Sequence, residues 1–81
     1  MYVTYILRSL KTHRYYTGHT KEIENRLHEH NVGESKSTRS GVPWVLIFQK
    51  EFSTRLEAMK EEARIKSWGA ARYLQKEDRS G

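Results

Sequence analysis

Two tyrosines, Tyr5 and Tyr16, stand in two short strand-like segments joined by a polar connection. A phenol near a metal ion or a guanidinium loses its proton more easily than in water, and it can then relay a proton from an attacking water molecule. Tyrosine is also at home in strands, where it packs against a core. The residue types alone leave both roles open, packing and chemistry.

Arg26 and His30 lie four residues apart in a segment that predicts a helix, so the two side chains would share one stripe of it. The planar guanidinium fork suits phosphate oxygens, and His30 could donate to the same phosphate. The alternatives are a solvated or ion-paired Arg26 and a histidine that stabilises the helix C-terminus, the role also expected of His28.

Glu62 is the candidate metal ligand. In the helix predicted to run to about Trp68, it lies on an apolar stripe between Ala58 and Ile65, and a carboxylate there needs a cation or a metal as its partner. Mg²⁺ suits a single carboxylate because water and phosphate can fill the remaining ligand positions. The alternative is an ordinary ion pair with Lys66, four residues on. The four histidines of the chain show no zinc-binding spacing.

The segment from Ser35 to Arg39 is rich in hydroxyls and cations, and glycines bracket it. Lys36, Thr38 and Arg39 are candidates to contact a nucleic-acid backbone. The alternative is a flexible linker that faces solvent.

Strand pairing must place the two tyrosines. Val3–Leu7 and Arg14–Thr17 predict a hairpin, and Gly18 is expected to end its second strand. An even loop puts Tyr5 and Tyr16 on one face of the sheet, and a four-residue loop over Ser9–Thr12 would set them directly opposite each other.

The remaining elements follow in order. A helix capped by Thr20 is expected from about Lys21, with a buried stripe of Ile23 and Leu27. The unbroken apolar run in Trp44–Gln49 predicts a strand buried on both faces.

The second helix begins with a capping box, Thr54 and Glu57. In that helix Leu56, Met59 and Ala63 form a second apolar stripe. A short third helix is expected over Ala70–Glu77. The order β-β-α-β-α-α predicts a single α+β domain over residues 1–81, with a core of about 2–72 and a tail that frays from Asp78.

Composition narrows the class of protein. The chain has 81 residues, 36% of them hydrophobic, and no cysteine, so one small core without disulfides is expected. Its longest apolar run, Val45–Phe48, is far short of the roughly 20 residues that span a bilayer. No signal peptide is recognisable, and a cytoplasmic location is the default expectation. A formal charge of +5 favours a polyanionic partner, of which nucleic acid is the commonest.

As an ordered set, these segments resemble the GIY-YIG nuclease domain, and most closely its short stand-alone bacterial members. The resemblance covers residues 2 to about 72 and rests on Tyr2–Leu7, Tyr16–Thr20, Arg26–Asn31, Thr38-Arg39 ahead of Pro43, and Glu57-Ala58 followed by Glu62-Ala63. It implies a small three-stranded antiparallel sheet flanked by helices.

The resemblance also implies roles for five residues. The two motif tyrosines fall on Tyr5 and Tyr16, the arginine on Arg26, a recurring histidine on His30 and the metal-binding glutamate on Glu62. Members of the family cleave phosphodiesters with a divalent metal on the glutamate, while a tyrosine assists the attacking water and the arginine stabilises charge on the phosphate. The resemblance thus implies a single site for Mg²⁺ or Mn²⁺.

Two functions therefore compete. The first is a metal-dependent endonuclease acting on DNA, possibly on irregular or repair-related structures. The second is a non-catalytic nucleic-acid-binding module on the same basic surface. A protein–protein adaptor has no support from the charge balance. For the nuclease, we expect Tyr5, Tyr16, Arg26 and Glu62 to line one side of the sheet, with His30 at its rim.

Overall fold

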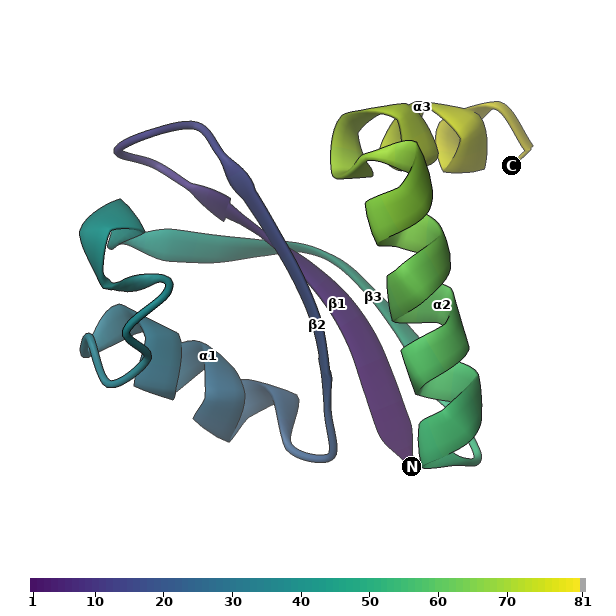
Figure 1. The fold of residues 1–81 in the computed structure, drawn as a ribbon, viewed down its shortest axis with the longest axis horizontal. Helices are drawn as coiled ribbons and strands as arrows, with labels where there is room; N and C mark the ends of the chain where they lie inside the picture. The colour runs from purple at the N-terminus through teal and green to yellow at the C-terminus, as the bar shows by residue number, and fades with distance from the viewer. Residues whose placement is uncertain (81) are drawn as a thin grey trace.

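The three strands form one antiparallel sheet in the order β2-β1-β3, and helices flank it (Figure 1). The computed structural model describes the backbone of residues 1–80 and the side chains of residues 1–77. The elements are β1 (Tyr2–Ser9), β2 (Tyr15–Thr20), α1 (Ile23–Asn31), a 3-10 turn (Arg39–Gly41), β3 (Trp44–Phe52), α2 (Arg55–Trp68) and α3 (Ala70–Ser80). The α+β class and the predicted order of elements are confirmed.

Strand β1 lies at the centre of the sheet and is buried continuously from Val3 to Leu7. Its one polar residue in that stretch, Thr4, donates its hydroxyl to the Ala58 carbonyl at 2.7 Å, which removes the cost of burying it. The expectation that Trp44–Gln49 is buried on both faces is wrong, because β3 is an edge strand. A run of apolar letters does not distinguish a central strand from an edge strand.

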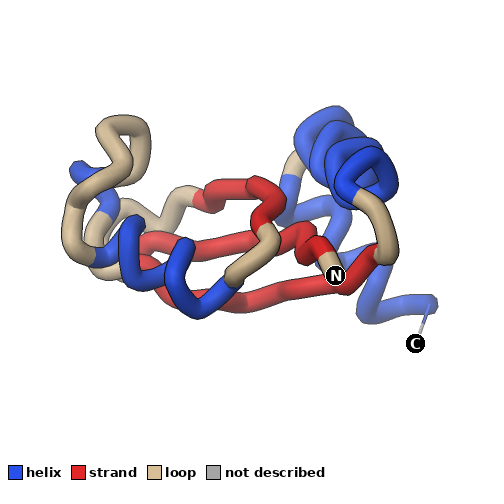
Figure 2. The backbone as a smooth tube through the Cα atoms, turned by 90° about the horizontal axis from the view of Figure 1, so that it is seen from below, coloured by secondary structure: helices blue, strands red, loops and turns tan. Residues whose placement is uncertain are grey.

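Helix α1 covers one face of the sheet, and α2 with α3 covers the other (Figures 1 and 2). Alternation along β1 supplies both cores, since successive side chains point to opposite faces. On the α1 face lie Val3, Tyr5, Leu7 and Trp44. On the α2 face lie Ile6, Ile65 and Tyr73.

The β1–β2 hairpin has a four-residue loop, residues 10–13, one residue later than expected. The Ser9 backbone N–H donates to the Arg14 carbonyl at 2.9 Å and so closes the ladder. The Ser9 hydroxyl also accepts from the backbone N–H groups of Lys11 and Thr12, which stabilises the turn. Ser9 is therefore the last strand residue and not the first loop residue.

This register pairs Tyr5 with Gly18 and Leu7 with Tyr16. The two tyrosines share a face of the sheet, as the even loop predicts, but they are diagonal neighbours; the expectation of direct opposition is wrong. Gly18 does not end the strand either, since β2 continues to Thr20.

Helix α1 begins later than expected, with Glu22 at the N-cap position and no side-chain cap. Thr20 instead accepts from the Glu22 backbone N–H at 3.2 Å, as a turn before the helix. The capping box of α2 is present as predicted, between Thr54 and Glu57. Helix α3 reaches Ser80, beyond the expected end at Glu77. The side chains of the expected frayed tail lie outside the described residues.

Helix α2 packs on the sheet through Ala58 and Ile65, as predicted, but its second apolar stripe is at the surface. Leu56 is 61% exposed and Met59 46%. The position that is buried in their place is Glu61, whose carboxylate accepts a hydrogen bond from the Tyr73 hydroxyl. A partner from α3 thus lets α2 turn a carboxylate inward, which helical periodicity alone cannot predict.

Candidate active site

Tyr5 stands on the central strand and is 1% exposed. Its ring lies against Gly18 of β2: a Cβ atom added there would be 2.7 Å from the Tyr5 hydroxyl oxygen and 2.9 Å from Cζ. Glycine is therefore required at position 18 for the phenol to extend to the edge of the sheet.

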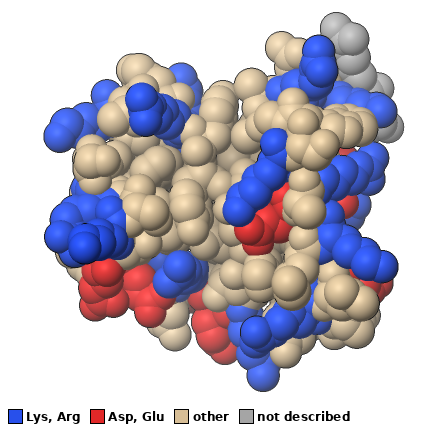
Figure 3. Space-filling model, in the orientation of Figure 1, with Lys and Arg blue, Asp and Glu red and all other residues tan. Residues whose placement is uncertain are grey.

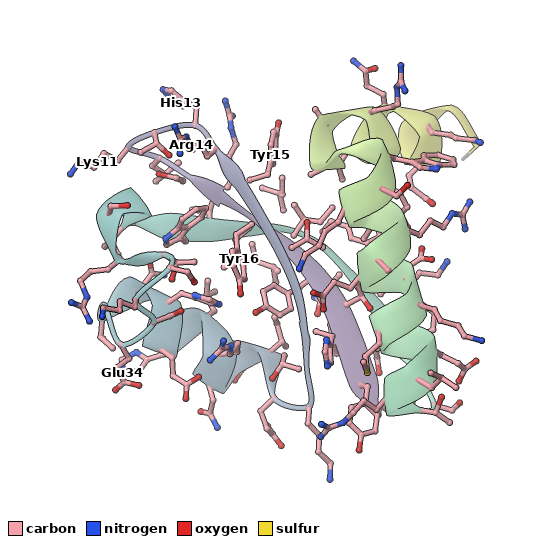
Figure 4. All side chains as sticks on the ribbon, in the orientation of Figure 1. Lys11, His13, Arg14, Tyr15, Tyr16 and Glu34 are labelled. Atoms are coloured by element: carbon pink, nitrogen blue, oxygen red, sulfur yellow. The ribbon has the colours of Figure 1, made fainter. Side chains whose placement is uncertain are left out.

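Tyr16 lies beside Tyr5, with ring centroids 6.4 Å apart. The Tyr16 and His30 rings pack edge to face, with centroids 4.9 Å apart. In Figure 4 the side chains of Tyr15 and Tyr16 leave β2 in opposite directions, with Tyr16 on the side of α1. Tyr16 is half-buried, so its ring borders the core of the α1 face without being enclosed by it.

His30, on the last turn of α1, is fully buried. Its Nε2 lies 3.1 Å from the Tyr5 hydroxyl, and its Nδ1 lies 2.7 Å from the Thr38 hydroxyl. The expectation of His30 at the rim of the site is wrong, because its ring is an internal link between β1 and the loop after α1. Both ring nitrogens of His30 have these side-chain partners, so His30 does not cap the C-terminus of α1, which was the alternative role.

Thr38 fixes the direction of this chain of hydrogen bonds. Its hydroxyl donates to the Ser35 carbonyl at 3.5 Å, so the same oxygen accepts from Nδ1–H of His30. Nε2 is then the acceptor for the Tyr5 hydroxyl. In this tautomer the Tyr5 hydroxyl donates to His30, and its oxygen can accept from the neighbouring Arg26 guanidinium.

Thr38 is 1% exposed, and the Trp44 indole N–H donates to its carbonyl at 2.7 Å. The prediction that its hydroxyl contacts nucleic acid is therefore wrong. Lys36 and Arg39 of the same loop are exposed, as that prediction needs. Arg39 also donates from Nε to the Gly33 carbonyl at 2.8 Å, which holds its side chain along the loop.

Arg26 is half-exposed on α1 and donates to the Glu29 carboxylate at 3.0 Å. Burial raises the pKa of Tyr5 to about 12, and the nearby Arg26 guanidinium acts against that rise. Burial, and then the charge of Arg26, lowers the pKa of His30. At neutral pH the site therefore combines a protonated phenol, a neutral imidazole and a cationic guanidinium.

Glu62 comes from α2, on the other face of the sheet. Its Oε1 lies 2.6 Å from Nδ1 of His19 and its Oε2 lies 2.7 Å from Nζ of Lys66. Burial alone would raise the pKa of this carboxyl, but the hydrogen bonds from Lys66 and His19 outweigh burial and lower it. The Glu62–Lys66 ion pair, one of the two alternatives in the sequence, is therefore present.

The expectation that Glu62 shares one side of the sheet with the two tyrosines is wrong. Strand β2 is an edge strand, so groups from both faces approach each other around it: Tyr5 and Tyr16 from one side, His19 and Glu62 from the other. The Glu62 charge is close enough to contribute to the raised pKa of Tyr5.

His19 is the residue of this site that sequence reasoning missed. It is two residues after Thr17 and so projects to the α2 face, a consequence of parity that is lost once Gly18 is taken as the strand end.

A pocket of about 380 Å³ opens at this edge of the sheet, between the start of β1, the end of β2, helix α1 and the start of α2. Its lining includes Tyr2, His19, Lys21, Arg26, Glu29 and Arg55. Figure 3 shows basic side chains on both flanks of the face seen there, on the side of α1 and on the side of α2 and α3. The pocket therefore combines the Arg26 guanidinium with further cations from separate elements.

No cluster of three or more histidines or acidic residues able to hold a metal occurs among the described residues. Glu62 would thus be a single protein ligand, which suits a cation that takes most of its ligands from water and substrate. Among the helices that the structure describes, none is both long and apolar enough to cross a membrane.

The GIY-YIG catalytic domain model matches residues 1–77 of the chain. The chain belongs to the GIY-YIG family. Its curated relatives include the UPF0213 protein SH2523 of Staphylococcus haemolyticus, 38% identical over 65 residues, which are 79% of this chain and 79% of the relative. The UPF0213 protein VNG_2274C of Halobacterium salinarum is 41% identical over 58 residues, 70% of this chain and 75% of the relative.

The solution NMR structure of the UPF0213 protein BH0048 from Bacillus halodurans has the same fold. It superposes with a TM-score of 0.58 at 29% identity, over 100% of this chain and 87% of BH0048. The resemblance to short stand-alone GIY-YIG proteins is therefore confirmed, and so is the three-stranded antiparallel architecture of the GIY-YIG domain.

Proposed function

We propose that the protein is a divalent-metal-dependent endonuclease that hydrolyses phosphodiester bonds in DNA. One observation carries the proposal: in a GIY-YIG chain, the hydrogen-bonded Tyr5–His30 pair, the Arg26 guanidinium and the Glu62 carboxylate meet around a single edge strand. Phosphodiester hydrolysis needs a group that takes a proton, a cation on the phosphate and charge neutralisation, and these side chains can supply them.

Arg26 binds the non-bridging oxygens of the scissile phosphate, since its planar fork matches their geometry. The attacking water forms the new P–O bond and passes its proton to the Tyr5 oxygen. The Tyr5 proton moves at the same time to Nε2 of His30. The bond to the leaving oxygen breaks, and that oxygen takes a proton from solvent. Tyr16, beside Tyr5 and half-exposed, orients the water.

Glu62 is the residue that fits a divalent ion, Mg²⁺ or Mn²⁺, with water and phosphate as the other ligands. Such an ion neutralises charge on the phosphate and makes a bound water more acidic. Both oxygens of Glu62 already have nitrogen partners, Nδ1 of His19 and Nζ of Lys66, so one of these contacts must be released first. Lys66 is the exposed partner, and its side chain can move into solvent.

The test compares wild type with Glu62→Gln, which removes the charge and keeps the shape. Branched, flapped and single-stranded DNA are incubated with Mg²⁺ or Mn²⁺. We expect cleavage by the wild type and none by the variant, with DNA binding without metal kept or strengthened. Equal cleavage by both proteins would exclude Glu62 as the metal ligand.

A second function, a non-catalytic nucleic-acid-binding module, is favoured by one specific observation. The Glu62 carboxylate is already satisfied by Lys66 and His19, as a purely structural carboxylate would be. No cleavage of any DNA by the wild type, together with binding that weakens as salt rises, would support the module and overturn the nuclease.

A further inference from the structure

We propose that Tyr2, Lys21 and Arg55 form a second phosphate-binding subsite, for the nucleic-acid backbone next to the scissile phosphate. The inference deepens the proposed function and rests on it, since Arg26 is taken to hold the scissile phosphate. The observation behind it is a paired cation arrangement at the pocket beside Arg26.

The Tyr2 ring carries two cations. The Lys21 Nζ lies 6.0 Å from the ring centroid, and the Arg55 guanidinium carbon lies 5.5 Å from it. Cations within about 6 Å of an aromatic ring are attracted by its quadrupole. Tyr2 thus gathers two long, exposed side chains from different parts of the chain, the segment before α1 and the first residue of α2.

All three residues line the pocket of about 380 Å³ that also contains Arg26. Its charge balance favours an anion. Three cations, Lys21, Arg26 and Arg55, face one carboxylate, Glu29, and that carboxylate is already paired with Arg26. Lys21 and Arg55 take part in no ion pair identified among the described side chains.

The position of the pocket selects a phosphodiester chain as the ligand. Its lining includes Arg26, which borders the two tyrosines of the site, and also Lys21 and Arg55, which lie on the Tyr2 ring at the start of β1. A strand with its scissile phosphate on Arg26 continues along this lining, so the neighbouring phosphate meets the two cations on Tyr2. A free phosphate ion would bind either Arg26 or the Lys21/Arg55 pair, and not both at once.

The molecule contains a matched control. Trp68 also carries one lysine and one arginine: Lys76 at 4.2 Å and Arg64 at 5.1 Å from its ring centroid. This group lies on α2 and α3 and contributes nothing to the lining of the pocket. Removing its two cations changes the net charge as much as removing Lys21 and Arg55, and it disrupts the same type of contact.

The experiment measures binding of a short single-stranded oligonucleotide by fluorescence anisotropy across NaCl concentrations, in EDTA so that no cleavage occurs. We expect Lys21→Ala/Arg55→Ala to weaken binding and to reduce the slope of log K against log[NaCl] by about 1.4, since each lost contact removes about 0.7. Arg64→Ala/Lys76→Ala should leave the slope at its wild-type value. Tyr2→Phe should bind as wild type does, and Tyr2→Leu more weakly.

An unchanged slope for Lys21→Ala/Arg55→Ala would overturn the subsite, and so would an equal fall in slope for the Trp68 pair. Wild-type affinity in Tyr2→Leu would overturn the role of the ring. Inorganic phosphate at matched ionic strength should compete weakly; competition as strong as that of the oligonucleotide would mean a free-anion site. The binding assay contains EDTA and does not depend on cleavage, so the two proposals can fail separately. Absence of cleavage in the Glu62 test would refute the nuclease, while a reduced slope for Lys21→Ala/Arg55→Ala would still show that these two cations contact phosphate.

Discussion

The Tyr5 hydroxyl occupies the space that a side chain at position 18 would need, and Gly18 has no side chain there. The two residues are cross-strand partners, and an added Cβ would come within 2.7 Å of the hydroxyl oxygen. The absence of a side chain at Gly18 is thus a requirement for the position of the Tyr5 hydroxyl.

Gly18→Ala should therefore force the buried Tyr5 ring to shift, at a cost of about 1–3 kcal/mol in the free energy of unfolding. Urea unfolding of Gly18→Ala, Tyr5→Phe and the double variant gives the coupling between the two positions. Because phenylalanine lacks the hydroxyl, the alanine should cost less in the Tyr5→Phe background. Strict additivity of the two changes would contradict the close approach.

His30 should make stability depend on pH. Its pKa is lowered in the folded state, so below about 6.5 the unfolded chain binds more protons than the folded one. The contribution of neutral His30 to the free energy of unfolding is therefore complete above that pH, and it is lost as the pH falls. Urea unfolding between pH 5 and pH 8 should show this decline in wild type and a weaker one in His30→Gln. His28→Gln, an exposed histidine on the same helix, is the control and should decline as wild type does.

Lys66 should compete with a divalent ion for Glu62. Lys66→Ala leaves Oε2 of Glu62 without its closest cation and removes one positive charge, so Mn²⁺ should bind more tightly than to wild type. Isothermal titration calorimetry with Mn²⁺ measures this directly, and cleavage should reach its half-maximal rate at a lower metal concentration. Lys60→Ala removes a cation elsewhere on α2 and serves as the control. Tighter binding in both variants would indicate a general charge effect.

The loop after α1 should contribute to DNA binding through its exposed cations. Replacing Lys36 and Arg39 with Ala should flatten the salt dependence of binding by up to about two units if both contact phosphate. Thr38→Ser should have no such effect, because the Thr38 hydroxyl is buried against His30. An unchanged slope in the Lys36/Arg39 variant would mean that the loop is only a connection.

Much of this fold could be predicted because its signals are local. The capping box at Thr54 and Glu57 defines the start of α2 without any tertiary information, and the even hairpin loop puts Tyr5 and Tyr16 on one face. The order of the strands could not be predicted in the same way. It depends on which strand gains two neighbours, and β1 does so although β3 carries the longer apolar run.

The site was predictable as a set of residues and less so as a geometry. Helical spacing brings Arg26 and His30 to the sheet, but the burial of His30 depends on Thr38, which arrives from a loop whose path has no simple periodicity. His19 was not predicted as a site residue because its role depends on the carboxylate of Glu62, 43 positions away in the chain. Such partnerships arise from packing between elements and leave no trace in local spacing.

The central position of β1 in the sheet determines which site residues lose their positions first when the protein begins to unfold. Tyr5 is carried by the strand whose backbone is paired on both sides, so its amide should exchange with solvent only when the whole sheet opens. Displacing the Tyr5 side chain should therefore require the free energy of global unfolding. Arg26 and Glu62, on helices at either side of the sheet, can instead be lost by partial opening at a much smaller cost in free energy. Mild denaturant would thus separate Arg26 and Glu62 from Tyr5 before the protein as a whole unfolds.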